Sequence, residues 1–190
     1  VKAGTVSDSL ISSIDLAPTI LELAGLPVSE TFQGKSFKTI LENPRATTRL
    51  HVFAEHNWHD FEDFGRAVRS SRFKYIRNFY TDLPGTPPAD AVRSETYVKM
   101  LQLKNEDKLT ADQLSCFLTP RPEIELYDLE ADPHELHNLA GQKEFQKVQE
   151  ELRAVLDQWQ EETHDRLPRT RRPDEFDRET GQQLPAFRKK

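Results

Sequence analysis

Six apolar side chains recur at intervals of three and four residues toward the end of the chain. They are Phe145, Val148, Leu152, Val155, Leu156 and Trp159. This spacing places all six on one face of an α-helix of about five turns. A coiled-coil seam has a related spacing, but the repeat is too short to favour one. A helix with a single apolar stripe needs one apolar surface to cover it, and we expect that surface to be a sheet.

Four segments have the apolar patterns of β-strands. They are Leu50–Ala54, Arg66–Arg69, Arg72–Arg77 and Glu125–Leu129. The second and third flank Ser70-Ser71, and apolar side chains alternate with polar ones after this pair, which predicts a β-hairpin. The sequence therefore predicts a small α+β unit, in which a short antiparallel sheet is backed by a helix over Glu144–Glu162.

The first 25 residues predict a short helix that ends at Gly25. Asp15 is the expected cap, with Ser12 and Ser13 as alternatives, and its charge suits the positive end of the helix dipole. Pro18 then falls within the first turn, where its missing N–H has no intrahelical partner. Further helices are expected over Phe37–Glu42 and Ser94–Asn105.

Charge is distributed unevenly along the chain. The net charge is −6, yet residues 166–190 hold eight Lys or Arg against four Asp or Glu. This basic segment contains three prolines and little apolar pattern, so we expect an extended tail, ordered only by contact. Such a tail either binds an anionic partner or lies on the chain's own acidic surface, and we favour the second. No run of about 18 apolar residues exists, so no membrane span is expected. No nucleic-acid partner is expected either.

The densest group of functional side chains lies between the first strand and the hairpin. It contains Glu55, His56, Trp58, His59 and Asp60. Imidazoles donate hydrogen bonds to hydroxyl or sulfate groups, carboxylates accept from hydroxyls, and an indole stacks on a sugar ring. A metal site built on the two histidines is one alternative, although two His on a loop are a weak zinc signal. A surface loop with only local hydrogen bonds is the other.

Two arginines border this group. Arg66 follows the loop and could bind an anionic substrate, since a guanidinium matches sulfate oxygens in a bidentate way. Arg69 is expected to pair with a neighbouring carboxylate. The candidate substrate-binding residues are therefore Glu55, His56, His59 and Arg66.

Taken in order, several segments resemble the end of a sulfatase. Ile11–Gly25 is similar to the helix that follows the last core strand of that family, and Gln33-Gly-Lys-Ser-Phe37 to its QG-x-S turn. Arg66–Ile76 resembles the hairpin that reads R-x-V-R-x-x-x-x-K-Y-I. Glu125–Ala140 resembles the C-terminal signature, a strand and an Asp-Pro turn followed by Asn-Leu-Ala. Within the family, F-A-E before the histidines and W-x-x-E-T-H-D at Trp159–Asp165 are similar to the heparan N-sulfatase branch.

The resemblance implies a hydrolase that uses formylglycine, made from Cys in C-x-P-x-R, together with Ca²⁺ held by Asp and Asn oxygens. Cys116-Phe-Leu-Thr-Pro-Arg121 departs from that motif in the positions of both Pro and Arg, so Cys116, the single cysteine, is an ordinary small side chain. No catalytic nucleophile and no metal ligands are expected here, and the chain alone is predicted to be inactive. Formylglycine and Ca²⁺ would belong to the missing N-terminal catalytic domain.

The resemblance also sets the expected organisation. Residues 1–48 would finish an α/β catalytic domain of alkaline-phosphatase/sulfatase type, residues 49–165 would form the C-terminal α+β sub-domain, and residues 166–190 a charged tail. The start at Val1 looks like the interior of a longer chain. The expected substrate is a sulfated glycan, most of all N-sulfoglucosamine of heparan type. Alternatives are an O-sulfated polysaccharide and a stand-alone glycan-binding or structural module. By family analogy, the compartment would be periplasmic, extracellular (secreted) or lysosomal.

Overall fold

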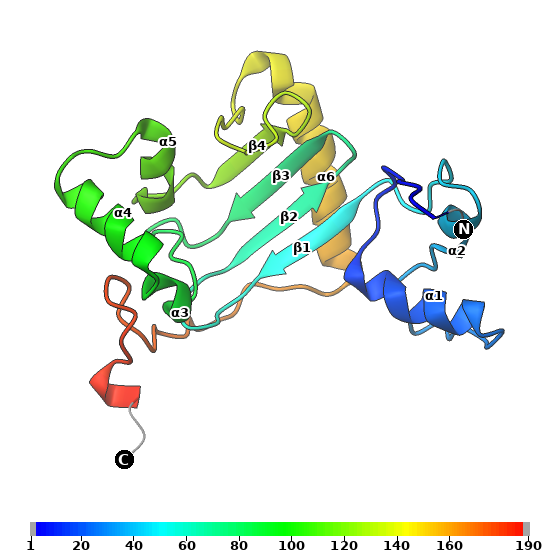
Figure 1. Ribbon diagram of the computed structural model, residues 1–190, viewed down its shortest axis with the longest axis horizontal. Helices are drawn as coiled ribbons and strands as arrows, with labels where there is room; N and C mark the ends of the chain where they lie inside the picture. The colour runs from blue at the N-terminus through cyan, green and yellow to red at the C-terminus, as the bar shows by residue number, and fades with distance from the viewer. Residues whose placement is uncertain (1–2, 188–190) are drawn as a thin grey trace.

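An antiparallel sheet of four strands lies at the centre of the computed structural model, which describes residues 3–187 (Figure 1). The strands lie side by side in chain order and are β1 (Val52–His56), β2 (Gly65–Arg69), β3 (Phe73–Asn78) and β4 (Ile124–Asp128). The predicted hairpin is confirmed, with Val68 of β2 opposite Tyr75 of β3. The first strand is shifted from its expected position, because Leu50 lies before it and is 74% exposed.

The main core lies between this sheet and α6 (Gln146–Glu162), which crosses one face of it (Figure 1). Its buried residues are Val68, Tyr75 and Leu126 from the strands with Leu152 and Leu156 from the helix. At the β1 edge, the ring of Trp159 stacks on that of Phe53, with centroids 5.0 Å apart. The apolar side chains that indicated the strands and the helix thus pack against one another, and the predicted α+β arrangement is confirmed.

The Asp-Pro turn after β4 folds back along that strand. The side chain of Asn138 forms hydrogen bonds that a further strand would otherwise make with β4. Its Oδ1 accepts from the N–H of Leu126 at 2.9 Å, and its Nδ2 donates to the carbonyl of Ile124 at 3.0 Å. Asp132 accepts a hydrogen bond from the N–H of His137 at 2.8 Å, and this bond helps to lower the pKa of Asp132. The motif therefore closes the second edge of the sheet.

Residues 3–50 form a separate group of short elements beside the β1 edge (Figure 1). After a 3₁₀ turn at Ser13–Asp15, α1 covers Leu16–Leu23, and α2 covers Lys38–Glu42. Asp15 is fully buried, and its carboxylate accepts from the N–H groups of Ser12 and Lys35, both at 2.8 Å, and pairs with Arg49. Asp15 stands at the N-cap position of α1, as predicted, but its side chain makes no cap hydrogen bond there and instead holds the connection that leads to the helix. Gly34 is obligatory here, since a Cβ at this position would lie 2.0 Å from the carbonyl oxygen of Ile14.

Short helices gather at the opposite end of the sheet, where the tail also arrives (Figure 1). They are α3 (Ala89–Val92), α4 (Glu95–Asn105) and α5 (Ala111–Leu114). Ser94 caps α4 by accepting from the N–H of Tyr97 at 3.3 Å. A second small core joins Phe61, Ala89 and Val92 to Phe176 of the tail. Within residues 3–187, no helix is both long and apolar enough to cross a membrane.

Candidate functional site

The candidate site is the loop between β1 and β2, together with the ends of both strands. His56 is the last residue of β1, and His59 lies in the loop three residues further on. Both line one small hollow of about 20 Å³. Its other lining residues are Asp60, Phe61, Asp63, Thr86, Pro88 and Arg178. The predicted histidines are therefore brought together at the end of the sheet that carries the short helices.

A carboxylate orients each imidazole. His56 Nδ1 lies 3.3 Å from Asp63 Oδ2, and His59 Nδ1 lies 3.3 Å from Asp60 Oδ1. Both histidine side chains remain well exposed, at 63% and 73%. With Nδ1 directed to a carboxylate, Nε2 is the nitrogen that can meet a ligand.

The two carboxylates are themselves fixed by the fold. Asp63 is buried and forms a bidentate pair with Arg121. The second oxygen of Asp60 accepts from the N–H of Ala89, at the start of α3, at 2.7 Å. The imidazoles are thus held through acidic side chains that have partners of their own, an arrangement that sets the ring orientation.

The other two predicted residues lie on the opposite face of the sheet. Glu55 and Arg66 are register partners in β1 and β2, and Arg66 shares the α6 face with Val68 because side chains alternate along a strand. Glu55 Oε2 lies 3.7 Å from Arg66 Nη2. The site residues therefore divide into a histidine pair on one face and a Glu-Arg pair on the other.

Arg66 is only 2% exposed and is held by groups of the chain itself. Its Nε and Nη2 each donate to a carboxylate oxygen of Asp165 at 2.7 Å. Its Nη1 donates to Asn57 Oδ1 at 3.0 Å and to the carbonyl of Gly65 at 2.7 Å, and the guanidinium lies 3.8 Å from the centre of the Phe64 ring. The structure directs Arg66 inward, where it supports the loop.

The segment after α6 brings Asp165 to this arginine. His164 has a left-handed φ of 55°, and the N–H of Asp165 donates to the carbonyl of Gln160 at 2.9 Å, which ends the helix in a tight turn. The T-H-D part of the sequence signature therefore ends α6 and supplies the carboxylate that pairs with Arg66. Arg69 does not pair as expected: it is exposed, and no ion pair of Arg69 is found within residues 3–187.

Acid should weaken this link. The Arg66 guanidinium lowers the pKa of Asp165 from its usual range, against desolvation, which raises it, and Gln160 adds a second lowering hydrogen bond. A carboxyl with a depressed folded pKa contributes stability above its unfolded pKa of about 3.9 and loses it as the pH falls through the folded value. We expect Asp165→Asn to flatten the decline in unfolding free energy below about pH 4. Urea unfolding from pH 7 to 2 checks this, with exposed Asp112→Asn as the control; equal slopes in wild type and Asp165→Asn would contradict it.

Trp58 is engaged by the tail. Its Nε1 donates to the carbonyl of Pro173 at 3.0 Å, and the guanidinium of Arg172 lies 3.4 Å from the centre of its ring. One face of the indole is therefore covered by a cation rather than open to a sugar.

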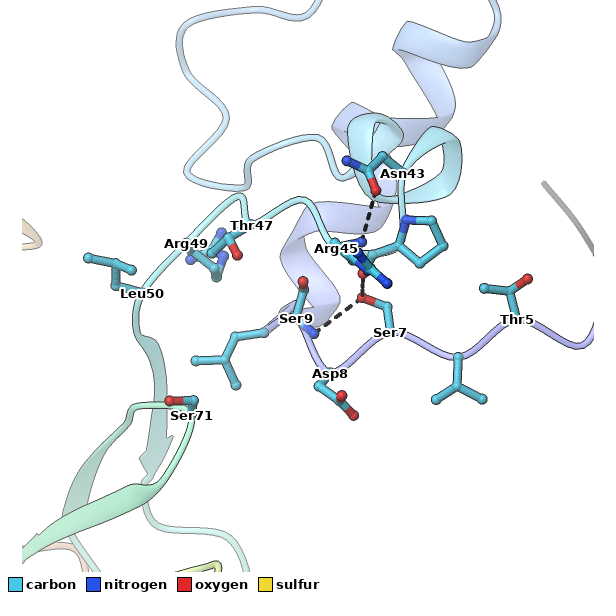
Figure 2. A pocket seen from close by; sticks show the side chains of 13 residues that line it. Thr5, Ser7, Asp8, Ser9, Asn43, Arg45, Thr47, Arg49, Leu50 and Ser71 are labelled. Carbon is cyan, nitrogen blue, oxygen red and sulfur yellow. Dashed lines mark hydrogen bonds between the residues drawn. The ribbon is translucent and has the colours of Figure 1, made fainter.

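A larger groove, which shares no lining residue with the histidine hollow, lies between residues 5–10 and the segment before β1 (Figure 2). It has a volume of about 710 Å³. Ser7 Oγ donates to the carbonyl of Pro44 at 2.6 Å and so joins the two segments. Apolar side chains stand exposed on this part of the chain, among them Val6 at 82% and Ile20 at 62%.

The described residues do not fit the metal or the nucleophile of a sulfatase. Within residues 3–187, no three His, Cys, Asp or Glu side chains converge as metal ligands. Cys116 is exposed in a 3₁₀ turn that follows α5 and does not line the histidine hollow. No chemical step can therefore be derived from these residues.

Sequence reasoning missed several residues that shape the site. They are Asp63, Arg121, Asp174 and Arg178. Asp63 lies within the predicted loop and could have been included with the other carboxylates. The other three come from segments without apolar periodicity, so nothing local connects them to the loop.

A known protein family matches most of the chain. The family described as "N-sulphoglucosamine sulphohydrolase, C-terminal" matches residues 1–87 and 91–162. An "Ulvan-active sulfatase" of Formosa agariphila is 40% identical over 160 residues, which cover 83% of this chain and 26% of that protein. The human "N-sulphoglucosamine sulphohydrolase" is 32% identical over 177 residues, covering 85% and 34%. The chain thus spans about a quarter to a third of these relatives.

Solved structures show the same fold. A protein in complex with its substrate D-glucosamine-2-N,6-O-disulfate superposes with a TM-score of 0.61 at 27% identity, covering 88% of this chain and 27% of the other. A 2-O GAG sulfatase superposes with a TM-score of 0.53 at 25% identity, covering 80% and 25%. The expected fold class is confirmed by these neighbours.

Proposed function

Because the chain belongs to the sulfatase family described as N-sulphoglucosamine sulphohydrolase, C-terminal, we propose that it is the C-terminal part of an enzyme that hydrolyses sulfate from a sulfated glycan. In this proposal the chain supplies substrate contacts and not the reacting groups. Formylglycine and Ca²⁺ would be held by the preceding catalytic domain. The groove of Figure 2 and the exposed apolar side chains of α1 would be covered by that domain. The boundary near residue 48 stays a prediction, as does a periplasmic, secreted or lysosomal compartment.

One observation carries the proposed role of the loop: His56 and His59 line a common hollow, each with Nδ1 directed to a carboxylate. Two Nε2 atoms so presented suit the oxygens of a sulfate or the hydroxyls of a sugar. Glu55 is 56% exposed and would accept from a hydroxyl at the other side of the strand end. We assign Arg66 the support of this loop through Asn57, not direct contact with the glycan.

N-sulfoglucosamine of heparan type is the proposed substrate. The match to the human N-sulphoglucosamine sulphohydrolase and to its family supports it. An O-sulfated polysaccharide is the second candidate, favoured by the 40% identity to the "Ulvan-active sulfatase". Assays of the complete enzyme with N-sulfoglucosamine, N-acetylglucosamine 6-sulfate and ulvan fragments would separate the two. A protein that binds these glycans but releases no sulfate would favour the stand-alone module instead.

His59→Ala in the complete enzyme is expected to lower kcat/KM by about 10- to 100-fold, because a hydrogen bond from an oriented donor to the bound glycan is lost. The fold should persist, since the imidazole is 73% exposed. The matched control is His137→Ala, another exposed histidine, whose Nδ1 lies 3.6 Å from Asp132. Steady-state kinetics with a thermal melt checks both variants. Unchanged kinetics for His59→Ala on the preferred glycan would remove the loop from the substrate site.

A further inference from the structure

The tail after α6 makes specific contacts with the rest of the structure, although it lies beyond the family match, which ends at residue 162. After α6 it runs past the β1–β2 loop to the short helices, as its orange and red trace shows (Figure 1). There Phe176 joins the small core of Phe61, Ala89 and Val92. The tail therefore has fixed contacts with the same loop that carries His59.

Arg178 is the centre of these contacts. Its Nε and one Nη2 hydrogen bind Asp174, at 2.7 and 2.9 Å. Its remaining Nη2 hydrogen donates to the carbonyl of Glu62 at 2.8 Å, and its Nη1 donates to the carbonyl of Pro84 at 3.1 Å and to Thr86 Oγ1 at 3.0 Å. One side chain thus joins three segments that are distant in sequence.

Backbone contacts complete the attachment. The N–H of Glu62 donates to Asp174 Oδ1 at 2.6 Å, and the N–H of Glu175 donates to the carbonyl of Asp60 at 3.0 Å. Asp60 is the residue whose carboxylate faces His59 Nδ1. The tail therefore fixes the backbone on both sides of the loop's aromatic residue, Phe61.

The side chain of Arg178 lines the histidine hollow, yet all five of its N–H groups are used within the chain. It is 15% exposed, and its charge is matched by Asp174. An arginine so occupied holds protein groups in place and does not bind an anion. Its effect on a substrate would pass through the loop.

We propose that the tail segment Asp174–Arg178 is a clamp on the β1–β2 loop and that Arg178 is a positioning residue for His59. The kinetic part of this inference rests on the proposed role of the loop in substrate binding. The clamp itself rests only on the contacts between the tail and the loop.

Hydrogen exchange in the full-length protein tests the clamp. In Arg178→Gln, the amides of Glu62 and Glu175 are expected to exchange at least about tenfold faster than in wild type. Arg178→Lys keeps the charge but has only three donors, so it should be intermediate. Arg169→Gln removes the same charge from an exposed position of the tail and should change neither amide. Unchanged exchange in Arg178→Gln would overturn the clamp, and the Lys variant keeps the test valid if Gln perturbs folding.

Kinetics tests positioning. Arg178→Gln is expected to lower kcat/KM by no more than His59→Ala does, about 10- to 100-fold, because it misplaces that binding group rather than removing it. In a His59→Ala background, the same change should cost less than about twofold, because both act through one contact. Additive losses would overturn the positioning role while leaving the loop in the site. If His59→Ala alone changes nothing, the proposed function of the loop and the kinetic role of Arg178 both fail, and the clamp is judged on exchange alone.

Discussion

Arg66→Ala is expected to lower the free energy of unfolding by about 3–5 kcal/mol, the cost of breaking a buried ion pair by removing one partner. The change leaves Asp165, itself largely buried, without its bidentate donor at 2.7 Å. It also leaves Asn57 and the carbonyl of Gly65 without the Nη1 donor and opens space beside the Phe64 ring. Urea unfolding followed by circular dichroism measures the loss.

Arg69→Ala is the matched control for this variant. Arg69 lies in the same strand, three residues further on, and its side chain is exposed. Its removal should change stability by no more than about 0.5 kcal/mol. A double-mutant cycle with Asp165→Ala should show strong coupling to Arg66, since the two share one network. Equal losses for Arg66→Ala and Arg69→Ala would show that the buried pair contributes nothing of its own.

Leu156→Ala is expected to cost about 2–5 kcal/mol, because it removes a fully buried side chain from the only interface between α6 and the sheet in the described core. The neighbours Val68, Tyr75 and Leu126 belong to strands and cannot move far to fill the cavity. Gln158→Ala on the exposed face of α6 is the control and should change little. Thermal and urea unfolding measure both; a loss below about 1 kcal/mol for Leu156→Ala would mean that this core is loosely packed.

The sheet and its helix could be predicted from the sequence because each has a clear period. The alternation through Phe73 and Tyr75 predicted β3, and the stripe through Leu152 and Leu156 predicted α6. The same alternation predicts that the side chain of Arg66 is buried. It stands two residues before Val68, so both side chains lie on the buried face. A charged side chain at a core position of a strand indicates a buried ion pair before it indicates a ligand site.

Helices α3 and α5 and the contacts of the tail could not be predicted in this way. The helices α3 and α5 have four residues each, fewer than a repeat needs to show a face. The tail is held by arginine side chains and backbone groups, whose partners leave no local pattern in the sequence. Its expected position on the chain's own acidic surface agrees with the pairing of Arg171 with Glu62 and Asp82. The sequence does not indicate which carboxylates pair with the arginines of the tail, because these groups come together only in the folded chain.

The distance in sequence between the clamp and the loop affects the order in which the protein matures. Glu62 meets Asp174 across 112 residues, whereas β1, β2 and β3 can pair once residue 78 has left the ribosome. Chains that fold during synthesis complete their earlier units first. The sheet would then form while the histidine loop is still unfastened, and the loop would become ordered only when the tail leaves the ribosome. A nascent protein from which α6 but not Asp174 has emerged would therefore have its core, while the histidine loop would still lack its contacts with the tail.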